Sequence, residues 1–123
     1  FTSMNYDGDE IMHAPMEYNV FRAPIDNDKN IVIEWTKAGY DRAVTRVYET
    51  EAVHDTNVAV IKCRMSMAAV SRPKFLDFEM VWRIYGDGSV KAQMKGTRNP
   101  NTPYLPRLGL KILLPKSFQR VEY

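Results

Sequence analysis

The chain has 123 residues, of which 45% are hydrophobic, and its 17 basic and 15 acidic side chains give a formal charge of +2. This length suits one globular domain with its own core, and the scattered charges include no basic cluster that would neutralise a run of phosphates. The longest apolar runs span only a few residues, far fewer than the roughly 20 of a membrane helix, so the sequence argues against nucleic-acid-binding and membrane-spanning proteins.

The first predicted element is a short hairpin at the N-terminus. Asp7-Gly8 lies between residues 1–6 and 10–12, and Asp-Gly is a strong signal for a tight turn between two strands.

Residues 21–28 form a polar string, Phe-Arg-Ala-Pro-Ile-Asp-Asn-Asp, that no periodic element requires. Pro24 fixes its own φ and favours extended geometry in the residue before it. Asp26, Asn27 and Asp28 can bond backbone amides or cap a following helix. The string therefore predicts a rigid, hydrogen-bonded loop.

One helix is predicted directly after this loop. Asp28 or Asn30 can cap its start, and Gly39 stands where a left-handed C-terminal residue belongs. Two helical turns are marginal alone, so packing through Trp35 must hold the helix. Its apolar face consists of Ile31, Trp35 and Ala38.

Strands follow the helix. Residues 42–50 are rich in β-branched and aromatic side chains, which favour a strand. Residues 59–67 alternate, with Cys63 among the apolar odd positions while Lys62, Arg64 and Ser66 face the other way. One face of this strand is therefore predicted to be core and the other wet.

A β-hairpin is predicted from residues 76–84 and 90–95. The even positions of the first segment are apolar, Trp82 included, and Gly86-Asp87-Gly88 supplies the turn. In the second segment Val90, Ala92 and Met94 alternate with Lys91, Gln93 and Lys95.

The last part of the chain combines a stiff connection with a final strand. Residues 99–103, Asn-Pro-Asn-Thr-Pro, hold two prolines and show no periodicity, whereas apolar residues alternate from Leu108 to Leu114. Six or seven strands joined by short turns indicate an all-β fold, an antiparallel sandwich with one short helix.

Three ordered motifs resemble those of the C-terminal small-chain domain (domain 5 type) of family 2 β-galactosidases. Residues 22–28 are similar to the family's Arg-Ala-Pro-x-Asp-Asn-Asp, residues 35–39 to Trp-x-x-Ala-Gly, and residues 105–118 to a Leu-Pro-Arg-x-Gly run followed by Leu-Pro and Phe. The structural positions of the motifs are Arg22, Pro24, Asp26, Asn27, Asp28, Trp35, Gly39, Pro106 and Gly109.

The resemblance implies that residues 1–123 are a single domain, the N-terminal half of a supersandwich related to galactose mutarotase. Such a domain supports a (β/α)8 barrel and closes one side of the sugar pocket of an enzyme that hydrolyses terminal β-D-galactosides with retention. Its partners are then the remaining domains of the same polypeptide and the galactoside substrate. A chain that begins at Phe1 without an initiator Met and stops at Tyr123 just after a hydrophobic pattern fits an excised piece.

No catalytic residue is predicted in this chain. Retaining glycosidases need two carboxyl groups about 5 to 5.5 Å apart, and the resemblance implies that the family's catalytic glutamates lie in the preceding barrel. Asp26 and Asp28 are better interpreted as turn formers and caps. Arg22 is expected to pair with one of them, because galactosides carry no negative charge. The isolated chain is therefore expected to be inactive.

The family carries a loop just after the first motif that closes over bound sugar. Here residues 29–34 run almost directly into Trp35, so this loop is short and a gating role is not expected.

Substrate-proximal candidates are aromatic residues and one arginine. Trp35 and Trp82 lie on apolar faces and are expected in the core. Tyr40, next to a glycine, and Tyr104, near prolines, are the exposed candidates for a sugar-facing ring, and Arg107 in the third motif is added to them.

Metal and redox chemistry are not predicted. His13 and His54 lie far apart without a ligand pattern, and Cys63 is the only cysteine, so an internal disulfide is excluded. The Mg²⁺ and Na⁺ that the full-length family enzymes often use are expected to bind mainly elsewhere, which leaves no cofactor for this chain. A single thiol is compatible with the cytoplasm and the periplasm alike.

The alternative interpretation is a stand-alone carbohydrate-binding or mutarotase-like β-sandwich. An epimerase needs a general acid and base, usually His and Glu, and the two histidines lack such a setting. Half of a supersandwich would also leave a sheet edge or apolar face uncovered, so the isolated piece is predicted to be able to form a homodimer.

Overall fold

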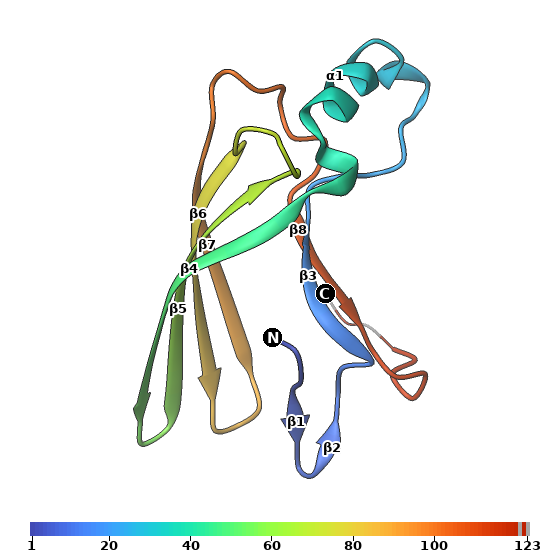
Figure 1. The fold of residues 1–123 in the computed structure, drawn as a ribbon. Helices are drawn as coiled ribbons and strands as arrows, with labels where there is room; N and C mark the ends of the chain where they lie inside the picture. The colour runs from blue at the N-terminus through green and yellow to red at the C-terminus, as the bar shows by residue number, and fades with distance from the viewer. Residues whose placement is uncertain (121, 123) are drawn as a thin grey trace.

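The computed structural model describes residues 1–120 and 122, and its largest element is a four-stranded antiparallel sheet (Figure 1). Four consecutive strands form it in the order β4-β5-β6-β7. They are β4 (Val44–Asp55), β5 (Val58–Ala68), β6 (Leu76–Tyr85) and β7 (Val90–Arg98). The predicted hairpin of β6 and β7 is confirmed. The strand predicted at residues 42–50 begins later, at Val44, and continues to Asp55.

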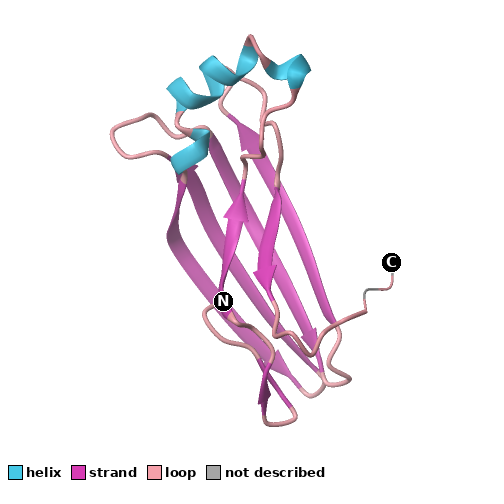
Figure 2. Ribbon diagram, turned by 90° about the vertical axis from the view of Figure 1, so that its right-hand side faces the viewer, coloured by secondary structure: helices cyan, strands magenta, loops and turns pink. Residues whose placement is uncertain are grey.

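A second, two-stranded sheet faces the first. It pairs β3 (Ala14–Asn19) with β8 (Gly109–Leu113), so an early and a late segment of the chain lie side by side. Figure 2 shows this pair in front of the larger sheet, with strands of the larger sheet visible on either side. The predicted all-β antiparallel sandwich is confirmed, although one of its sheets has half as many strands as the other.

The strand β3 is absent from the sequence-based prediction. Pro15 interrupts the pattern, and the register of β3 against β8 shifts between Ala14 and Glu17. Proline is tolerated at such an irregularity in an edge strand because one ladder hydrogen bond is already missing there. The alternation of the apolar residues Met16, Tyr18 and Val20 could have indicated this strand.

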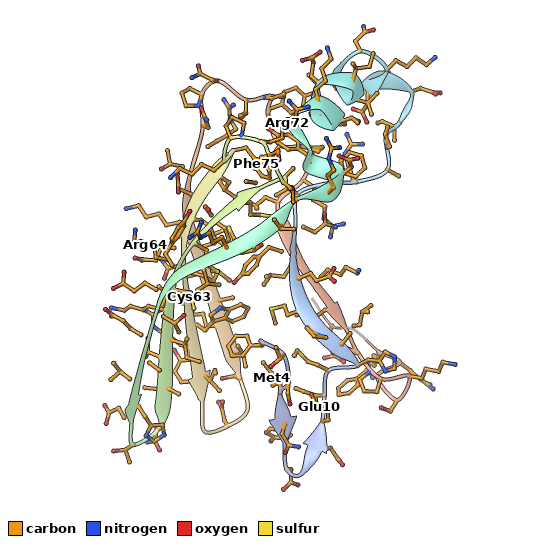
Figure 3. All side chains as sticks on the ribbon, in the orientation of Figure 1. Met4, Glu10, Cys63, Arg64, Arg72 and Phe75 are labelled. Atoms are coloured by element: carbon orange, nitrogen blue, oxygen red, sulfur yellow. The ribbon has the colours of Figure 1, made fainter. Side chains whose placement is uncertain are left out.

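The N-terminal hairpin is shorter than predicted. Its strands are β1 (Asn5–Tyr6) and β2 (Asp9–Glu10), joined through Asp7 and Gly8, whose φ values of 51° and 91° suit a type I′ turn. The Glu10 carboxylate accepts hydrogen bonds from the backbone amides of Met4 and Met12 and from the Ser3 hydroxyl. Figure 3 labels Met4 and Glu10 on this hairpin.

The core lies between the two sheets and beneath the helix. Its larger members come from β5, β6, the helix and the loops at one end of the sandwich. These are Val20, Trp35, Tyr40, Met65, Met67, Phe75, Leu76, Phe78, Met80 and Trp82. The inward alternation predicted for residues 59–67 and 76–84 is therefore confirmed for their buried members.

One outward position differs from the prediction. Ser66, expected on the wet face, is buried, and its hydroxyl lies 2.9 Å from the Tyr48 hydroxyl. Tyr48 is the residue of β4 left without a partner where the register shifts between Val47 and Glu49, and its side chain lies on the same face as Ser66.

The helical segment closes one end of the sandwich. A short 3₁₀ helix (Asp26–Asp28) precedes α1 (Ile31–Ala38), and a second one (Tyr40–Arg42) leads into β4. Gly39 has φ 82° and donates its backbone amide to Thr36, so its predicted left-handed C-terminal role is confirmed. None of the described helices has the length and apolar character needed to cross a membrane.

Candidate functional site

The three sequence motifs meet at the helical end of the sandwich. Here Arg22 and Asp28 of the first motif, Trp35 of the second and Pro106 of the third lie in contact, together with Tyr104 just before the third motif. We call this set, together with Tyr40, the motif junction. Figure 1 shows α1 above the two sheets, where the segment that follows β3 and the segment that follows β7 converge.

Arg22 and Asp28 form the polar centre of the motif junction. The guanidinium donates to both carboxylate oxygens, with Nη1–Oδ2 at 2.7 Å and Nη2–Oδ1 at 3.1 Å. The Ile25 amide donates to Oδ2 as well, at 2.9 Å, and closes the loop. This bidentate geometry is the strong form of an arginine–carboxylate contact, and it confirms the predicted internal pair.

Asp28 does not cap the helix. Its carboxylate is already engaged by Arg22 and Ile25, and Asn30, which occupies the N-cap position, has helical φ and ψ and makes no side-chain cap bond. The prediction that one of these two residues caps α1 through its side chain is therefore wrong. The Asp28 carboxylate therefore forms its hydrogen bonds within residues 22–28 and not with the backbone of α1.

Arg22 also ties the first motif to the other two. Its Nε donates to the Pro106 carbonyl at 3.3 Å, and its guanidinium lies 5.5 Å from the centre of the Trp35 ring. Arginine combines both contacts because its planar group stacks on a ring while its edge donates hydrogen bonds. Lysine would lose this combination.

Trp35 is the apolar anchor of the motif junction. It is fully buried, its indole Nε1 donates to the Tyr104 carbonyl at 3.1 Å, and its ring meets that of Tyr104 edge-on at 5.7 Å. An indole needs such an acceptor when it is buried. The predicted core position of Trp35 is confirmed.

Tyr40 is not an exposed sugar platform, contrary to the prediction. Only 2% of it is exposed, its hydroxyl donates to the Pro103 carbonyl at 2.6 Å, and its ring packs against Phe75 at 4.6 Å. The adjacent Gly39 turns the chain inward, because its left-handed backbone reverses direction at the helix end. Figure 3 labels Phe75 beside the helical segment.

The other substrate-proximal candidates remain on the surface. Tyr104 is 58% exposed and Arg107 is exposed, and both belong to the segment that leads from the proline-rich connection into β8. Pro24, Asp26 and Asn27 are also exposed on the loop, while Gly109 starts β8 opposite Asn19. The motif junction thus buries its anchors and leaves Tyr104 and Arg107 facing outward.

Residues 103–106, at the end of the proline-rich connection and just after it, supply acceptors that the sequence pattern did not indicate. The carbonyls of Pro103, Tyr104 and Pro106 receive the side-chain donors of Tyr40, Trp35 and Arg22. Backbone acceptors carry no residue-type signature, so only Pro100 and Pro103, which fix the backbone φ at their positions, pointed to an ordered segment.

We expect Tyr40→Phe to lower the free energy of unfolding by about 1–3 kcal/mol. The substitution keeps the ring against Phe75. It removes only the hydroxyl that donates to the Pro103 carbonyl. Denaturant unfolding followed by circular dichroism measures the loss. Tyr6→Phe, on an exposed tyrosine, is the matched control, and an equal effect in both variants would contradict this role.

The pH dependence of stability should include a contribution from Asp28. Hydrogen bonding from Arg22, then from the Ile25 amide, lowers the pKa of Asp28 below its usual range. A carboxylate with a lowered pKa in the folded state stabilises it above the unfolded pKa of about 3.9. That stabilisation should vanish as the pH falls from about 4 through the lower folded pKa. Melting temperatures across this range should fall less steeply for Asp28→Asn than for the unsubstituted chain, and parallel curves would contradict the assignment.

The charged groups outside the motif junction alternate in sign across a solvent-exposed face. On the outer face of the larger sheet Glu49 lies opposite Arg64, Arg64 opposite Glu79, and Glu79 opposite Lys95. Such alternation stabilises a solvated face. His13 and His54 are exposed, Cys63 is half-buried, and the described residues contain no group of three or more side chains able to hold a metal.

Comparison with known proteins gives one family. A family model described as beta galactosidase small chain matches residues 1–123. A β-galactosidase of Actinobacillus pleuropneumoniae is 34% identical over 123 residues, which is all of this chain and 12% of that protein. A β-galactosidase of Staphylococcus xylosus is 33% identical over 105 residues, 85% of this chain and 11% of that protein. A β-galactosidase of Enterobacter cloacae is 26% identical over 128 aligned positions, covering 95% of this chain and 12% of that protein. The chain therefore spans about an eighth of the length of the relatives it matches.

Proposed function

Since this chain belongs to the β-galactosidase small-chain family, we propose that it is a non-catalytic β-sandwich domain of a longer β-galactosidase. The observation that carries the proposal is the full-length family match, joined to the small share of each relative that the chain covers. In this proposal the longer polypeptide hydrolyses terminal β-D-galactosides, and the catalytic carboxyl groups lie outside residues 1–123.

The proposed role of the domain is to support the catalytic barrel and close one side of the sugar pocket. The motif junction supports this role because its partly buried ion pair and its indole anchor fix one end of the sandwich while Tyr104 and Arg107 stay exposed. An exposed ring and a guanidinium held by a rigid backbone suit contacts to sugar hydroxyls and to C–H faces.

The central experiment compares the 123-residue chain with the longer polypeptide in hydrolysis of a chromogenic β-galactoside. We expect activity from the longer polypeptide and none from the chain alone. Calorimetric titration of the chain with galactose and lactose is a second readout. Measurable hydrolysis by the chain would overturn its non-catalytic assignment, and heat of sugar binding at millimolar concentration would favour a stand-alone carbohydrate-binding module instead.

The positioning of Tyr104 and Arg107 is tested in the longer polypeptide. If they contact sugar before and during the reaction alike, Tyr104→Ala and Arg107→Ala should raise KM several-fold with kcat little changed. Tyr85→Ala, at an exposed tyrosine on the far end of β6, is the matched control. Unchanged KM values in the first two variants would remove these residues from the sugar pocket.

We propose that the chain itself contributes no cofactor ligand, so that any Mg²⁺ or Na⁺ of the full enzyme is bound mainly by other segments. Chelation of divalent cations should then leave the melting temperature of the 123-residue chain unchanged, even if it lowers the activity of the longer polypeptide. A lower melting temperature of the chain after chelation would contradict this.

A further inference from the structure

The connection between β7 and β8 is held by side chains instead of by a strand ladder. Residues 99–106 form no strand, and they cross from the larger sheet to the side of α1 (Figure 1). Four of their backbone carbonyls each accept a hydrogen bond from a different side chain. These are the carbonyls of Thr102, Pro103, Tyr104 and Pro106, which accept from Arg98, Tyr40, Trp35 and Arg22 in that order. The path of the connection therefore depends on the four donor side chains.

Asn99 forms the turn that starts this connection. Its backbone carbonyl accepts from the Thr102 amide at 3.1 Å and from the Thr102 hydroxyl at 2.7 Å. Its side-chain oxygen accepts from the Asn101 amide at 3.0 Å, and Pro100 occupies the second position of the turn, where a fixed φ is favoured. Its side-chain amide donates to the Lys74 carbonyl at 3.1 Å. The turn is thus fixed up to Thr102, whereas the residues after Thr102 depend on donors from elsewhere.

Arg98 is the donor that the larger sheet supplies to these residues. It is the last residue of β7 and lies opposite Leu76. Its Nη1 donates to the Asn99 carbonyl at 3.0 Å, to the Thr102 carbonyl and, at a longer distance of 3.5 Å, to the Pro103 carbonyl. No carboxylate of the described residues pairs with Arg98. Because hydrogen bonds from a charged donor are stronger than those between neutral groups, Arg98 ties the connection to the end of β7.

Tyr104 lies where the residues held by Arg98 meet those held by the helical segment. The carbonyls of Thr102 and Pro103 contact Arg98, and the next carbonyl, that of Tyr104, accepts from Trp35. The Tyr104 ring touches Trp35 only edge-on and is mostly exposed. Burial therefore does not fix the direction of this ring. Its direction depends on the backbone that carries it, because the allowed side-chain rotamers follow from φ and ψ.

We propose that Arg98 is a positioning residue for the sugar-facing ring of Tyr104. Arg98 does not touch the sugar in this proposal, and it acts by fixing the carbonyls just before Tyr104, so that the ring meets the galactoside in one orientation. The inference rests on the proposed function, since that function places Tyr104 at the sugar pocket. The attachment of the connection to Arg98 rests on the hydrogen bonds alone. A role confined to stabilising the turn would lower the melting temperature without affecting substrate binding.

The first test measures hydrogen exchange of the Trp35 indole N–H in the 123-residue chain by nuclear magnetic resonance. This N–H donates to the Tyr104 carbonyl, so its exchange rate reports how firmly that carbonyl is held. Arg98→Ala should speed the exchange about 2- to 10-fold, the effect of one net hydrogen bond on an opening equilibrium. Arg46→Ala, at an exposed arginine on the opposite edge strand β4, is the matched control and should leave the rate unchanged. An unchanged rate in Arg98→Ala would overturn the proposal.

The second test measures hydrolysis kinetics in the longer polypeptide. Arg98→Ala should raise KM several-fold with kcat little changed, as expected for Tyr104→Ala. Because Arg98 acts through Tyr104, the double variant should have a KM no higher than that of Tyr104→Ala alone. Arg98→Lys keeps a cationic donor but loses the planar fork, so its KM should lie between those of Arg98→Ala and the unsubstituted enzyme. Independent, multiplying increases of KM in the double variant would overturn the proposal.

Two further outcomes separate this inference from the proposed function. A raised KM in Tyr104→Ala with an unchanged KM in Arg98→Ala would overturn the positioning role and keep Tyr104 at the sugar pocket. An unchanged KM in both variants would remove Tyr104 from the pocket and overturn this inference with it, while galactoside hydrolysis by the longer polypeptide would still support the assignment of the chain to a β-galactosidase.

Discussion

Replacing Trp35 by alanine should lower the free energy of unfolding by about 3–5 kcal/mol, the usual cost of truncating a fully buried aromatic side chain. The indole fills the space between α1 and the third motif and donates to the Tyr104 carbonyl. Its removal leaves a cavity, an unpaired carbonyl and a guanidinium at Arg22 without its stacking partner. The helix is too short to persist without this contact.

Trp35→Phe separates the two parts of this effect. It keeps most of the ring volume and loses the indole donor, so we expect a smaller loss of about 1–3 kcal/mol. Guanidinium chloride unfolding followed by far-ultraviolet circular dichroism measures both variants without relying on tryptophan emission. A loss below about 1 kcal/mol for Trp35→Ala would show that the motif junction does not anchor the helix.

Gly39→Ala should destabilise the chain by about 2–5 kcal/mol through two separate effects. The left-handed backbone at φ 82° costs an alanine about 1–2 kcal/mol. A methyl group at this position would also lie 2.3 Å from the Cβ of Ala69, an overlap that costs about 1–3 kcal/mol to relieve in a packed site. The loop before Phe75 would have to move away from the helix end.

Two variants isolate these effects. Gly8→Ala, at φ 91° with no atom within 4 Å of the added methyl group, should show the backbone cost alone. Combining Gly39→Ala with Ala69→Gly removes the overlap, so the double variant should be more stable than the sum of the two single effects predicts. Additive effects in this cycle would contradict the close contact between the helix end and the 69–75 loop.

The elements with strict alternation could be predicted from the sequence, because a buried inward face repeats every second residue. The β6 strand is the clearest case, with its even positions buried up to Trp82. The strand β3 could not be predicted with the same ease. Its pattern is broken by Pro15, and its partner β8 comes from the other end of the chain. No local signal encodes such a pairing.

The candidate site divides in the same way. The pair of Arg22 with an aspartate and the burial of Trp35 follow from residue types at short spacing. The burial of Tyr40 does not, since it depends on where Gly39 turns the chain and where the carbonyl of Pro103 lies. The direction of the Tyr40 side chain cannot be predicted from its residue type or from its sequence neighbours. The sequence alone therefore overestimates how many of its tyrosines face solvent.

The pairing of β3 with β8 also has a consequence for the order of folding. The hairpins from β4 to β7 join neighbouring segments, so they close short loops and can form early. The β3–β8 ladder and the motif junction join segments from opposite ends of the chain. Their formation closes a loop of almost the whole chain, which costs more conformational entropy. We expect the four-stranded meander to assemble first and the second sheet to lock last, so substitutions at Trp35 should mainly speed unfolding and leave the folding rate little changed.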